Sequence, residues 1–156
     1  MAAASIRLFN WFGEIRCRPD RFIIKESEIM NKHIIMLVDD DDLILGTLKK
    51  RFETFDNQVY TASTEDEAKK ILSEVTPEVL VLDLLLKNEN GSSDILSFIR
   101  GESRLQNMVV LVLTNMDKPG LKDSLLAEGV KEYLIKGSIP IDELYEKVMG
   151  YLEPGK

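Results

Sequence analysis

The sequence predicts a doubly wound α/β fold, in which a five-stranded parallel sheet lies between two layers of helices. Two observations carry this prediction. After residue 33, short apolar runs alternate with amphipathic segments, and most of the runs are too continuously apolar to leave one face of a sheet in water. A sheet that is covered on both faces by the intervening helices accounts for both observations.

Five apolar runs are the predicted strands. They are, in chain order, IIMLV (34–38), VYTA (59–62), VLVLD (79–83), MVVLVL (108–113) and EYLI (132–135). Right-handed crossovers and the strand order 2-1-3-4-5 give the flavodoxin-like form of this three-layer sandwich, in which ligands bind outside the carboxyl ends of the strands. The first and third strands are then neighbours at the switch point.

Apolar residues spaced by three and four positions predict a helix after each strand. The residues that mark the five helices, in chain order, are Leu45, Leu48, Phe52 and Phe55; Ala68, Ile71, Leu72 and Val75; Ile95, Leu96 and Ile99; Leu121, Leu125 and Leu126; and Ile141, Leu144, Val148 and Leu152. Asp41 or Asp42 is expected to begin the first helix, because a carboxylate there meets unpaired N–H groups and the positive end of the helix dipole. Thr64 and Glu67 form a capping box for the second helix.

The composition limits the function classes. The chain has 156 residues, of which 44% are hydrophobic and 30% are charged, which fits one globular domain that folds alone. The net charge is -7 and the basic residues form no run, so direct nucleic-acid binding is not expected. The single Cys17 and the single His33 exclude an internal disulfide, a zinc site and a Cys/His nucleophilic pair. His33 is expected to be an exposed residue before the first strand.

Apolar stretches are all shorter than the ~20 residues of a membrane-spanning helix. The sequence therefore predicts a soluble protein without a transmembrane segment. A lone thiol fits the reducing cytoplasm, which is the predicted location.

Residues 1–29 lie outside the repeating pattern and differ in composition. They carry five basic and four acidic residues, and apolar residues gather between Ile6 and Ile15. The segment could form an amphipathic docking helix for a membrane or a partner, but Met30 stands four residues before the first strand, where a start codon would suit. An upstream mis-start or vector-like addition is favoured over a docking segment or a targeting peptide. Residues 30–156 are assigned to the domain.

Acidic residues gather where two neighbouring strands of this fold would end. Asp39 and Asp40 follow the first strand, and Asp83 ends the third. Crowded carboxylates oppose one another's ionisation unless a cation or a proton lies between them, and Mg²⁺ prefers oxygen ligands of this kind. The sequence therefore predicts a Mg²⁺ site formed by these three acids, with helix capping as the alternative role for Asp39 and Asp40.

Two further polar residues are expected at the same edge of the sheet. Thr114 ends the fourth strand and Lys136 follows the fifth, so a hydroxyl and an ammonium group join the acids. This set suits a phosphoryl transfer in which Asp83 attacks phosphorus, Mg²⁺ neutralises the phosphoryl oxygens, and Thr114 and Lys136 donate hydrogen bonds to them.

The segments at these strand ends resemble the receiver domain of two-component response regulators, of the stand-alone type. They are LVDDDD, VLVLD with Gly91 eight residues later, VLVLT and YLIKG. The resemblance spans residues 33–153. It implies that Asp83 is the phosphoacceptor and that Thr114 and Lys136 are catalytic and switch residues.

The same resemblance implies a metal site and an aromatic switch. Asp39 and Asp40 would hold Mg²⁺ with help from the backbone carbonyl of Leu85. Tyr133, three residues before the lysine, matches the aromatic residue that turns inward on activation in this family. The alternative is a partly buried strand tyrosine without a switching role.

The function implied by the resemblance is that of a stand-alone response regulator. It would take a phosphoryl group from a histidine kinase, a phosphotransfer protein or a small phosphodonor, and it would catalyse its own phosphorylation and dephosphorylation rather than turn over a separate substrate. Output is expected through partner binding or phosphoryl relay, on the face of the fourth helix, fifth strand and fifth helix, with homodimer formation on phosphorylation as one form.

Two other functions compete with this one. The first is a receiver-like interaction module that never uses phosphate. The second is a Mg²⁺-dependent phosphohydrolase, which would usually need a second acid two residues after the nucleophile, where Leu85 stands.

Several positions depart from the family pattern. Gly137 stands where a proline, often in a cis peptide, usually follows the lysine, and a cis non-proline bond would cost ~3 kcal/mol, so this loop is expected to be trans or more mobile. Lys87 replaces the usual proline after the acceptor, and Asn115 replaces a small residue. Leu85 and Met116 occupy the positions that orient the hydrolytic water in the family, which predicts slow loss of the phosphoryl group.

Overall fold

The computed structural model describes residues 33–54, 57–86 and 93–153. The expectations that lie outside these ranges concern residues 1–29, Phe55, Lys87 and Gly91. The elements are, in chain order, β1 (Ile34–Val38), α1 (Asp42–Phe52), β2 (Gln58–Ala62), α2 (Glu65–Glu74), β3 (Val79–Leu82), α3 (Ser93–Gly101), the 3-10 helix η3 (Ser103–Leu105), β4 (Val109–Thr114), α4 (Leu121–Ala127), β5 (Glu132–Ile135) and α5 (Ile141–Leu152). Each predicted strand and helix is present in the predicted order.

The strands form one parallel sheet in the order β2-β1-β3-β4-β5, as the sequence predicts. Val38 at the end of β1 lies opposite both Ala62 of β2 and Leu82 of β3. The sequence pattern places Asp83 inside the third strand, whereas β3 ends one residue earlier; the Asp83 N–H nevertheless donates to the Val38 carbonyl at 2.8 Å. The residues that follow β1 and β3 therefore emerge side by side.

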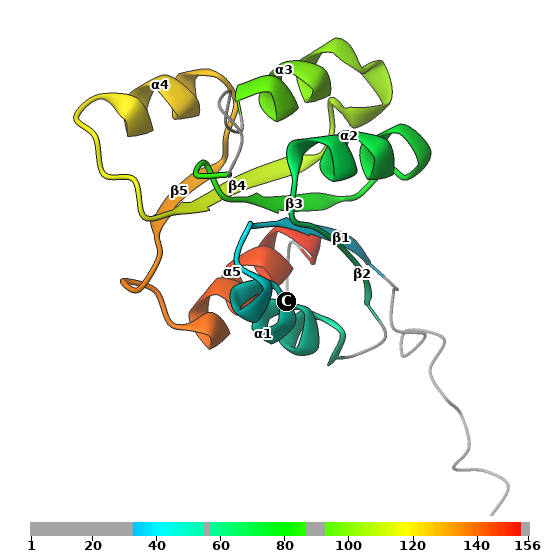
Figure 1. The fold of residues 1–156 in the computed structure, drawn as a ribbon, viewed down its shortest axis with the longest axis vertical. Helices are drawn as coiled ribbons and strands as arrows, with labels where there is room; N and C mark the ends of the chain where they lie inside the picture. Colours follow the sequence, from blue (N-terminus) through cyan, green and yellow to red (C-terminus); the bar gives the residue numbers. More distant parts are fainter. Residues whose placement is uncertain (1–32, 55–56, 87–92, 154–156) are drawn as a thin grey trace, which may run out of the picture. The chain divides into compact units, whose positions relative to one another are not determined.

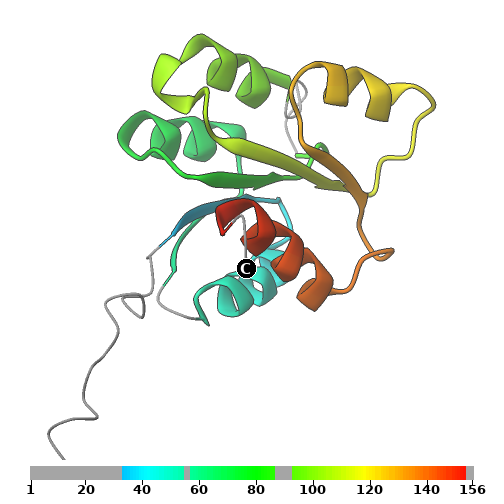
Figure 2. The same cartoon turned by 180° about the vertical axis from the view of Figure 1, so that it is seen from behind.

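Helices cover both faces of the sheet, as Figure 1 and the view from behind in Figure 2 show. α1 and α5 lie on one face, and α2, α3 and α4 lie on the other. Within β3, Leu80 and Leu82 belong to the apolar cluster on the α2–α4 side, while Val79 and Val81 belong to the cluster on the α1–α5 side. All four are at most 3% exposed. Burial on both faces is the reason why this strand is apolar at every position.

The first two helices begin at the predicted caps. Asp41 is the N-cap of α1, and its Oδ1 accepts hydrogen bonds from the N–H groups of Leu43 at 2.9 Å and Ile44 at 3.2 Å. Thr64 is the N-cap of α2, and its Oγ1 accepts from the Glu67 N–H at 3.2 Å. One of the four consecutive aspartates is therefore a helix cap.

The expectation that His33 is exposed is wrong. The residue is only 5% exposed at the amino edge of the sheet, and its Nδ1 lies 3.0 Å from Glu78 Oε2. The other oxygen of Glu78 accepts the Ile34 N–H at 3.1 Å, and Glu153 Oε1, just past α5, lies 3.9 Å from His33 Nε2. The start of β3 and the end of α5 thus cover a residue that sequence position alone places at an open strand end.

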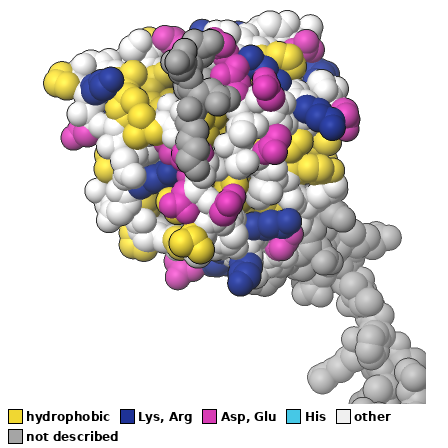
Figure 3. All heavy atoms as spheres, viewed as in Figure 1, with side chains coloured by type: hydrophobic (Ala, Val, Ile, Leu, Met, Phe, Trp, Pro, Cys, Tyr) yellow, Lys and Arg dark blue, Asp and Glu magenta, His cyan; other side chains and the backbone are white. Residues whose placement is uncertain are grey.

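Charged side chains of both signs are spread over the face of the domain that Figure 3 shows. In the view of Figure 3, the described Lys and Arg side chains lie apart from one another and among Asp and Glu side chains. Within the ranges that the structure describes, no helix has both the length and the apolar character needed to span a bilayer.

Candidate functional site

Three carboxylates converge at the carboxyl edge of the sheet. Asp39 follows β1 and Asp83 follows β3, and one carboxylate oxygen from each of Asp39, Asp40 and Asp83 lies within 4.8 Å of the others. Asp39 and Asp83 are each 3% exposed. Asp40 is only partly buried and opens the cluster to solvent. The convergence that strand order predicts is therefore present in the structure.

The two buried acids have matching backbone contacts. Asp39 Oδ1 accepts the N–H of Asp41 at 3.0 Å, and Asp83 Oδ1 accepts the N–H of Leu85 at 3.0 Å. In each case a carboxylate turns back onto the backbone two residues later, a local arrangement that aspartate forms readily at the start of a loop. One oxygen of each acid is therefore fixed by its own chain.

Lys136 connects the remaining oxygens of the two buried acids. Its Nζ lies 2.6 Å from Asp39 Oδ2 and 2.6 Å from Asp83 Oδ2. The lysine follows β5 directly, and its backbone N–H donates to the Thr114 carbonyl at 2.9 Å. The sequence predicts that Lys136 reaches this edge, and the structure adds that its ammonium group bridges both acids.

Burial and this bridge determine the charges at the site. Burial is the main reason why the pKa of Asp39 is raised, and the hydrogen bond from Lys136 opposes it. For Lys136, burial alone would lower the pKa of the ammonium group, but the hydrogen bonds to Asp39 and Asp83 and the attraction of their negative charges together outweigh it, and the pKa is raised. Lys136 therefore keeps its positive charge at neutral pH.

The donor set suits a hard divalent cation. Mg²⁺ takes oxygen ligands, commonly one or two carboxylates with water and phosphate oxygens, and the cluster of Asp39, Asp40 and Asp83 offers three carboxylates. The role of the Leu85 carbonyl as a further ligand stays a prediction.

Thr114 and Tyr133 both hold the backbone of Met116. Thr114, the last residue of β4, is fully buried, and its Oγ1 accepts the Met116 N–H at 3.2 Å. The half-buried Tyr133 donates its hydroxyl to the Met116 carbonyl, and burial raises the pKa of this phenol. Two of the predicted switch residues, Thr114 and Tyr133, therefore both hydrogen-bond one residue of the β4–α4 loop. In the described residues, the Thr114 hydroxyl has no hydrogen bond to Asp39 or Asp83.

The other residues that depart from the family pattern differ in exposure. The Leu85 side chain is 46% exposed, Asn115 is exposed and Met116 is half-buried. None of these positions carries an acid or a base.

Gly137 follows Lys136 through a trans peptide, since the described residues contain no cis peptide bond. Its φ is +79°, and the Ser138 N–H donates to the Ile135 carbonyl at 3.1 Å. The loop is therefore a hydrogen-bonded turn with a left-handed glycine, which is the trans alternative that the sequence leaves open.

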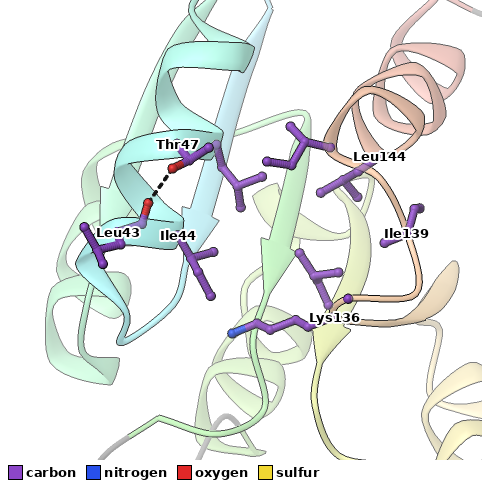
Figure 4. A pocket seen from close by; sticks show the side chains of 10 residues that line it. Leu43, Ile44, Thr47, Lys136, Ile139 and Leu144 are labelled. Carbon is purple, nitrogen blue, oxygen red and sulfur yellow. Dashed lines mark hydrogen bonds between the residues drawn. The ribbon is translucent and has the colours of Figure 1, made fainter.

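An apolar pocket beside the site is a feature that the sequence analysis missed. It has a volume of about 270 Å³ and lies between α1 and α5. Figure 4 shows Leu43 and Ile44 on one side, Ile139 on the other, and Lys136 extending between them. Leu43 is 82% exposed. A leucine directly after four aspartates, outside the apolar stripe of α1, is the signal that could have indicated this pocket.

Comparisons with known proteins point to one family. The model of the response regulator receiver domain matches residues 35–149. Protein RcaC of Microchaete diplosiphon is 30% identical over 114 residues, which are 73% of this chain and 17% of RcaC. The transcriptional regulatory protein PhoP of Escherichia coli K12 is 31% identical over 103 residues, which are 65% of this chain and 44% of PhoP. The chain thus spans less than half the length of these curated relatives.

Solved structures share the fold. The receiver domain of the Francisella response regulator 1452 has a TM-score of 0.68 and 26% identity, with 80% of this chain and 100% of that chain covered. A response regulator protein from Burkholderia pseudomallei, solved with a phosphorylated aspartic acid, a calcium ion and citrate, has a TM-score of 0.65 and 24% identity, with 78% of this chain and 67% of that chain covered.

Proposed function

The chain belongs to the response regulator receiver family, and we propose that it works as a phosphorylation-dependent switch with Asp83 as the phosphoacceptor. The observation that carries this proposal is the Lys136 ammonium group, 2.6 Å from an oxygen of both Asp39 and Asp83. An ammonium group in this position can hydrogen-bond the Asp83 carboxylate before phosphorylation and an oxygen of the phosphoryl group after it. The proposed donor is a histidine kinase, a phosphotransfer protein or a small phosphodonor.

In the proposed step, a carboxylate oxygen of Asp83 attacks the phosphorus of the donor. A new P–O bond forms, and the donor's bond to phosphorus breaks with its electron pair leaving on the donor atom. Lys136 then donates to a phosphoryl oxygen in place of the carboxylate oxygen that it contacts in the unmodified chain. The Thr114 hydroxyl can donate as well, because in its bond with the Met116 N–H its oxygen is the acceptor and its hydrogen is free.

The proposed metal ligands are Asp39, Asp40, Asp83 and the Leu85 carbonyl. Mg²⁺ bound there would supply positive charge beside the phosphoryl oxygens. The need for it follows from the cluster itself, because a phosphoryl group on Asp83 would add negative charge to an acid whose carboxylate oxygen already lies within 4.8 Å of oxygens of Asp39 and Asp40.

The proposed output surface is the face of α4, β5 and α5. Thr114 ends β4 and Tyr133 lies in β5, and both bind Met116 in the loop that leads to α4. A movement of Thr114 toward a phosphoryl group on Asp83 would therefore change the contacts of this loop and of Tyr133. We propose that a protein partner or a second copy of the chain binds this face.

The proposed receiver unit consists of residues 30–156, and residues 1–29 lie outside it. The proposed location of the protein is the cytoplasm.

Mass spectrometry with a small phosphodonor tests the function. Purified protein is incubated with acetyl phosphate and Mg²⁺ and weighed intact, and the acyl phosphate is then reduced with borohydride to mark the modified residue. We expect one added phosphoryl group, its loss in Asp83→Asn, and the reduced residue at position 83. Modification of Asp39 instead would reverse the assignment of the two acids.

The phosphate-independent interaction module predicts a different result. It requires that neither acetyl phosphate nor a histidine kinase adds a phosphoryl group while the unmodified chain still binds its partner. A phosphohydrolase would instead release inorganic phosphate from a separate substrate with many turnovers.

A further inference from the structure

The connection after Lys136 is a tight turn with one unusual backbone angle. The turn runs from Ile135 to Ser138, closed by the Ser138 N–H donating to the Ile135 carbonyl at 3.1 Å. Gly137, its third residue, has φ +79°. A positive φ at the third residue is a feature of type II turns, in which glycine is preferred at that position and asparagine is accepted less readily.

The requirement for glycine is conformational and not a matter of space. Among the described residues, no heavy atom outside the neighbouring residues lies within 4 Å of where a Cβ at Gly137 would stand. A side chain would therefore fit, but an L-residue is strained at this φ. The proline that family members usually carry at this position could not adopt it, because its ring fixes φ near −65°.

Two backbone contacts fix the position of Lys136, and this turn, of which Lys136 is the second residue, is one of them. In the other, the Lys136 N–H donates to the Thr114 carbonyl at 2.9 Å, which continues the pairing of β5 with β4. Gly137 and Ile139 also line the apolar pocket together with the Lys136 side chain, and Figure 4 shows that side chain extending from the connection between β5 and α5. The ammonium group must reach two acids at 2.6 Å each, so a small shift of the loop breaks at least one contact.

We propose that Gly137 is a positioning residue for phosphoryl transfer: its left-handed backbone holds the turn that keeps the Lys136 ammonium group between Asp39 and Asp83. The role in transfer rests on the proposed function of Asp83. In this chain, a turn with a trans peptide and a glycine thus positions Lys136, in a backbone conformation that a proline cannot adopt.

Gly129 provides a matched control. It also has a positive φ, +100°, and in the part of the chain that the structure describes no atom beyond its chain neighbours lies within 4 Å of where a Cβ would stand. It ends α4 in a Schellman motif, in which its N–H donates to the Leu126 carbonyl and the Val130 N–H donates to the Leu125 carbonyl, both at 3.1 Å. It precedes β5, whereas Lys136 follows that strand. Alanine at Gly129 therefore carries the same kind of backbone strain without touching the site.

The experiment compares Gly137→Ala, Gly137→Asn and Gly129→Ala in the full chain. The rate of phosphorylation by acetyl phosphate at saturating Mg²⁺ is followed by intact mass. We expect Gly137→Ala to lower this rate constant by roughly 10- to 100-fold, as a misplaced group about 1 Å from its position does. Gly137→Asn should recover most of the rate, because asparagine tolerates the left-handed conformation. Gly129→Ala should lose a few degrees in Tm and keep the wild-type rate.

A second measurement does not depend on phosphorylation. Lysine acetylation by a dilute amine-reactive ester is mapped by mass spectrometry, with the exposed Lys122 as internal reference. Labelling of Lys136 should rise severalfold in Gly137→Ala and stay at the wild-type level in Gly129→Ala. Equal labelling in the two variants, or a phosphorylation rate that falls no further in Gly137→Ala than in Gly129→Ala, would overturn the positioning role. If the wild-type chain accepts no phosphoryl group, the proposed function fails, and the labelling alone decides whether Gly137 positions Lys136.

Discussion

Replacing Lys136 with methionine tests how the site holds two buried acids. The substitution keeps an unbranched side chain to line the pocket and removes the ammonium group that lies 2.6 Å from both Asp39 and Asp83. Each acid retains its hydrogen bond from a backbone N–H. The substitution therefore removes the positive charge that compensates two carboxylates on side chains that are only 4% exposed.

The magnitude of the loss is bounded by protonation. Removing one partner of a buried ion pair costs about 3–5 kcal/mol, but the penalty cannot exceed the cost of protonating one acid. From an ordinary aspartate value of ~3.9, that cost is about 4 kcal/mol at pH 7 and about 1.5 kcal/mol at pH 5. We expect Lys136→Met to lower the free energy of unfolding by about 3–4 kcal/mol at pH 7 and by about 1.5 kcal/mol at pH 5.

The sign of the pH dependence follows from the pKa of Asp39. Burial already raises this pKa in the wild-type chain, and the loss of the hydrogen bond from Lys136 raises it further in the variant. A folded-state pKa above the unfolded value favours the folded state as pH falls through it. The deficit of the variant should therefore be largest at neutral pH and shrink toward pH 5.

Urea unfolding followed by circular dichroism, in metal-free buffer at both pH values, measures this effect. Lys122→Met, a change of an exposed lysine on α4, is the control and should alter stability by less than about 0.5 kcal/mol. Addition of Mg²⁺ should restore part of the lost stability, because a cation then faces the acids again. A deficit under about 1 kcal/mol that is equal at pH 7 and pH 5 would refute the charge-compensation argument.

Three further predictions concern the metal, the output and the lifetime of the signal. Asp40→Asn should weaken Mg²⁺ binding by about tenfold or more, ~1.4 kcal/mol, and should raise stability in metal-free buffer by relieving repulsion; unchanged affinity by titration would show that Asp40 does not bind the metal. Phosphorylation should change amide hydrogen exchange in α4, β5 and α5, and changes confined to α1 and α2 would contradict the proposed coupling. The phosphoryl group should persist for many minutes or longer, because neither Leu85 nor Met116 can orient water by hydrogen bonding. Polar replacement of both residues should speed its decay, as intact mass after donor removal would report.

The strand order and the convergence of the acids could be predicted because both follow from simple patterns. Continuously apolar strands require a sheet with two covered faces, and in the resulting order β1 and β3 are neighbours. The predicted end of the third strand is one residue too late, because β3 ends at Leu82, although the Asp83 N–H still pairs with the Val38 carbonyl. Local sequence patterns were sufficient to predict the position of a residue wherever that position is set by the strand or helix to which the residue belongs.

Features that depend on distant partners could not be predicted in this way. His33 is buried because Glu78, 45 residues later, lies against it at the same edge of the sheet. The bridge from Lys136 to both acids depends on the exact reach of one side chain. In the sequence, Gly137 indicates only that the loop lacks a proline. The structure adds that Gly137 has a left-handed φ, and this φ is the reason why a glycine is needed there.

The near-equivalence of Asp39 and Asp83 raises the question of which acid takes the phosphoryl group. Both follow a strand, both accept a backbone N–H and both contact Lys136. Their neighbours differ, because Asp39 precedes three further aspartates whereas Asp83 precedes Leu84 and the half-exposed Leu85. A phosphoryl group brings up to two negative charges at pH 7, and two unit charges 4 Å apart repel by about 4 kcal/mol at the effective dielectric of a protein surface. On either acid the new charge would face the other two carboxylates, because one oxygen of each of Asp39, Asp40 and Asp83 lies within 4.8 Å of the others; this repulsion therefore does not distinguish the two acids, and the mapping of the borohydride-reduced residue decides between them.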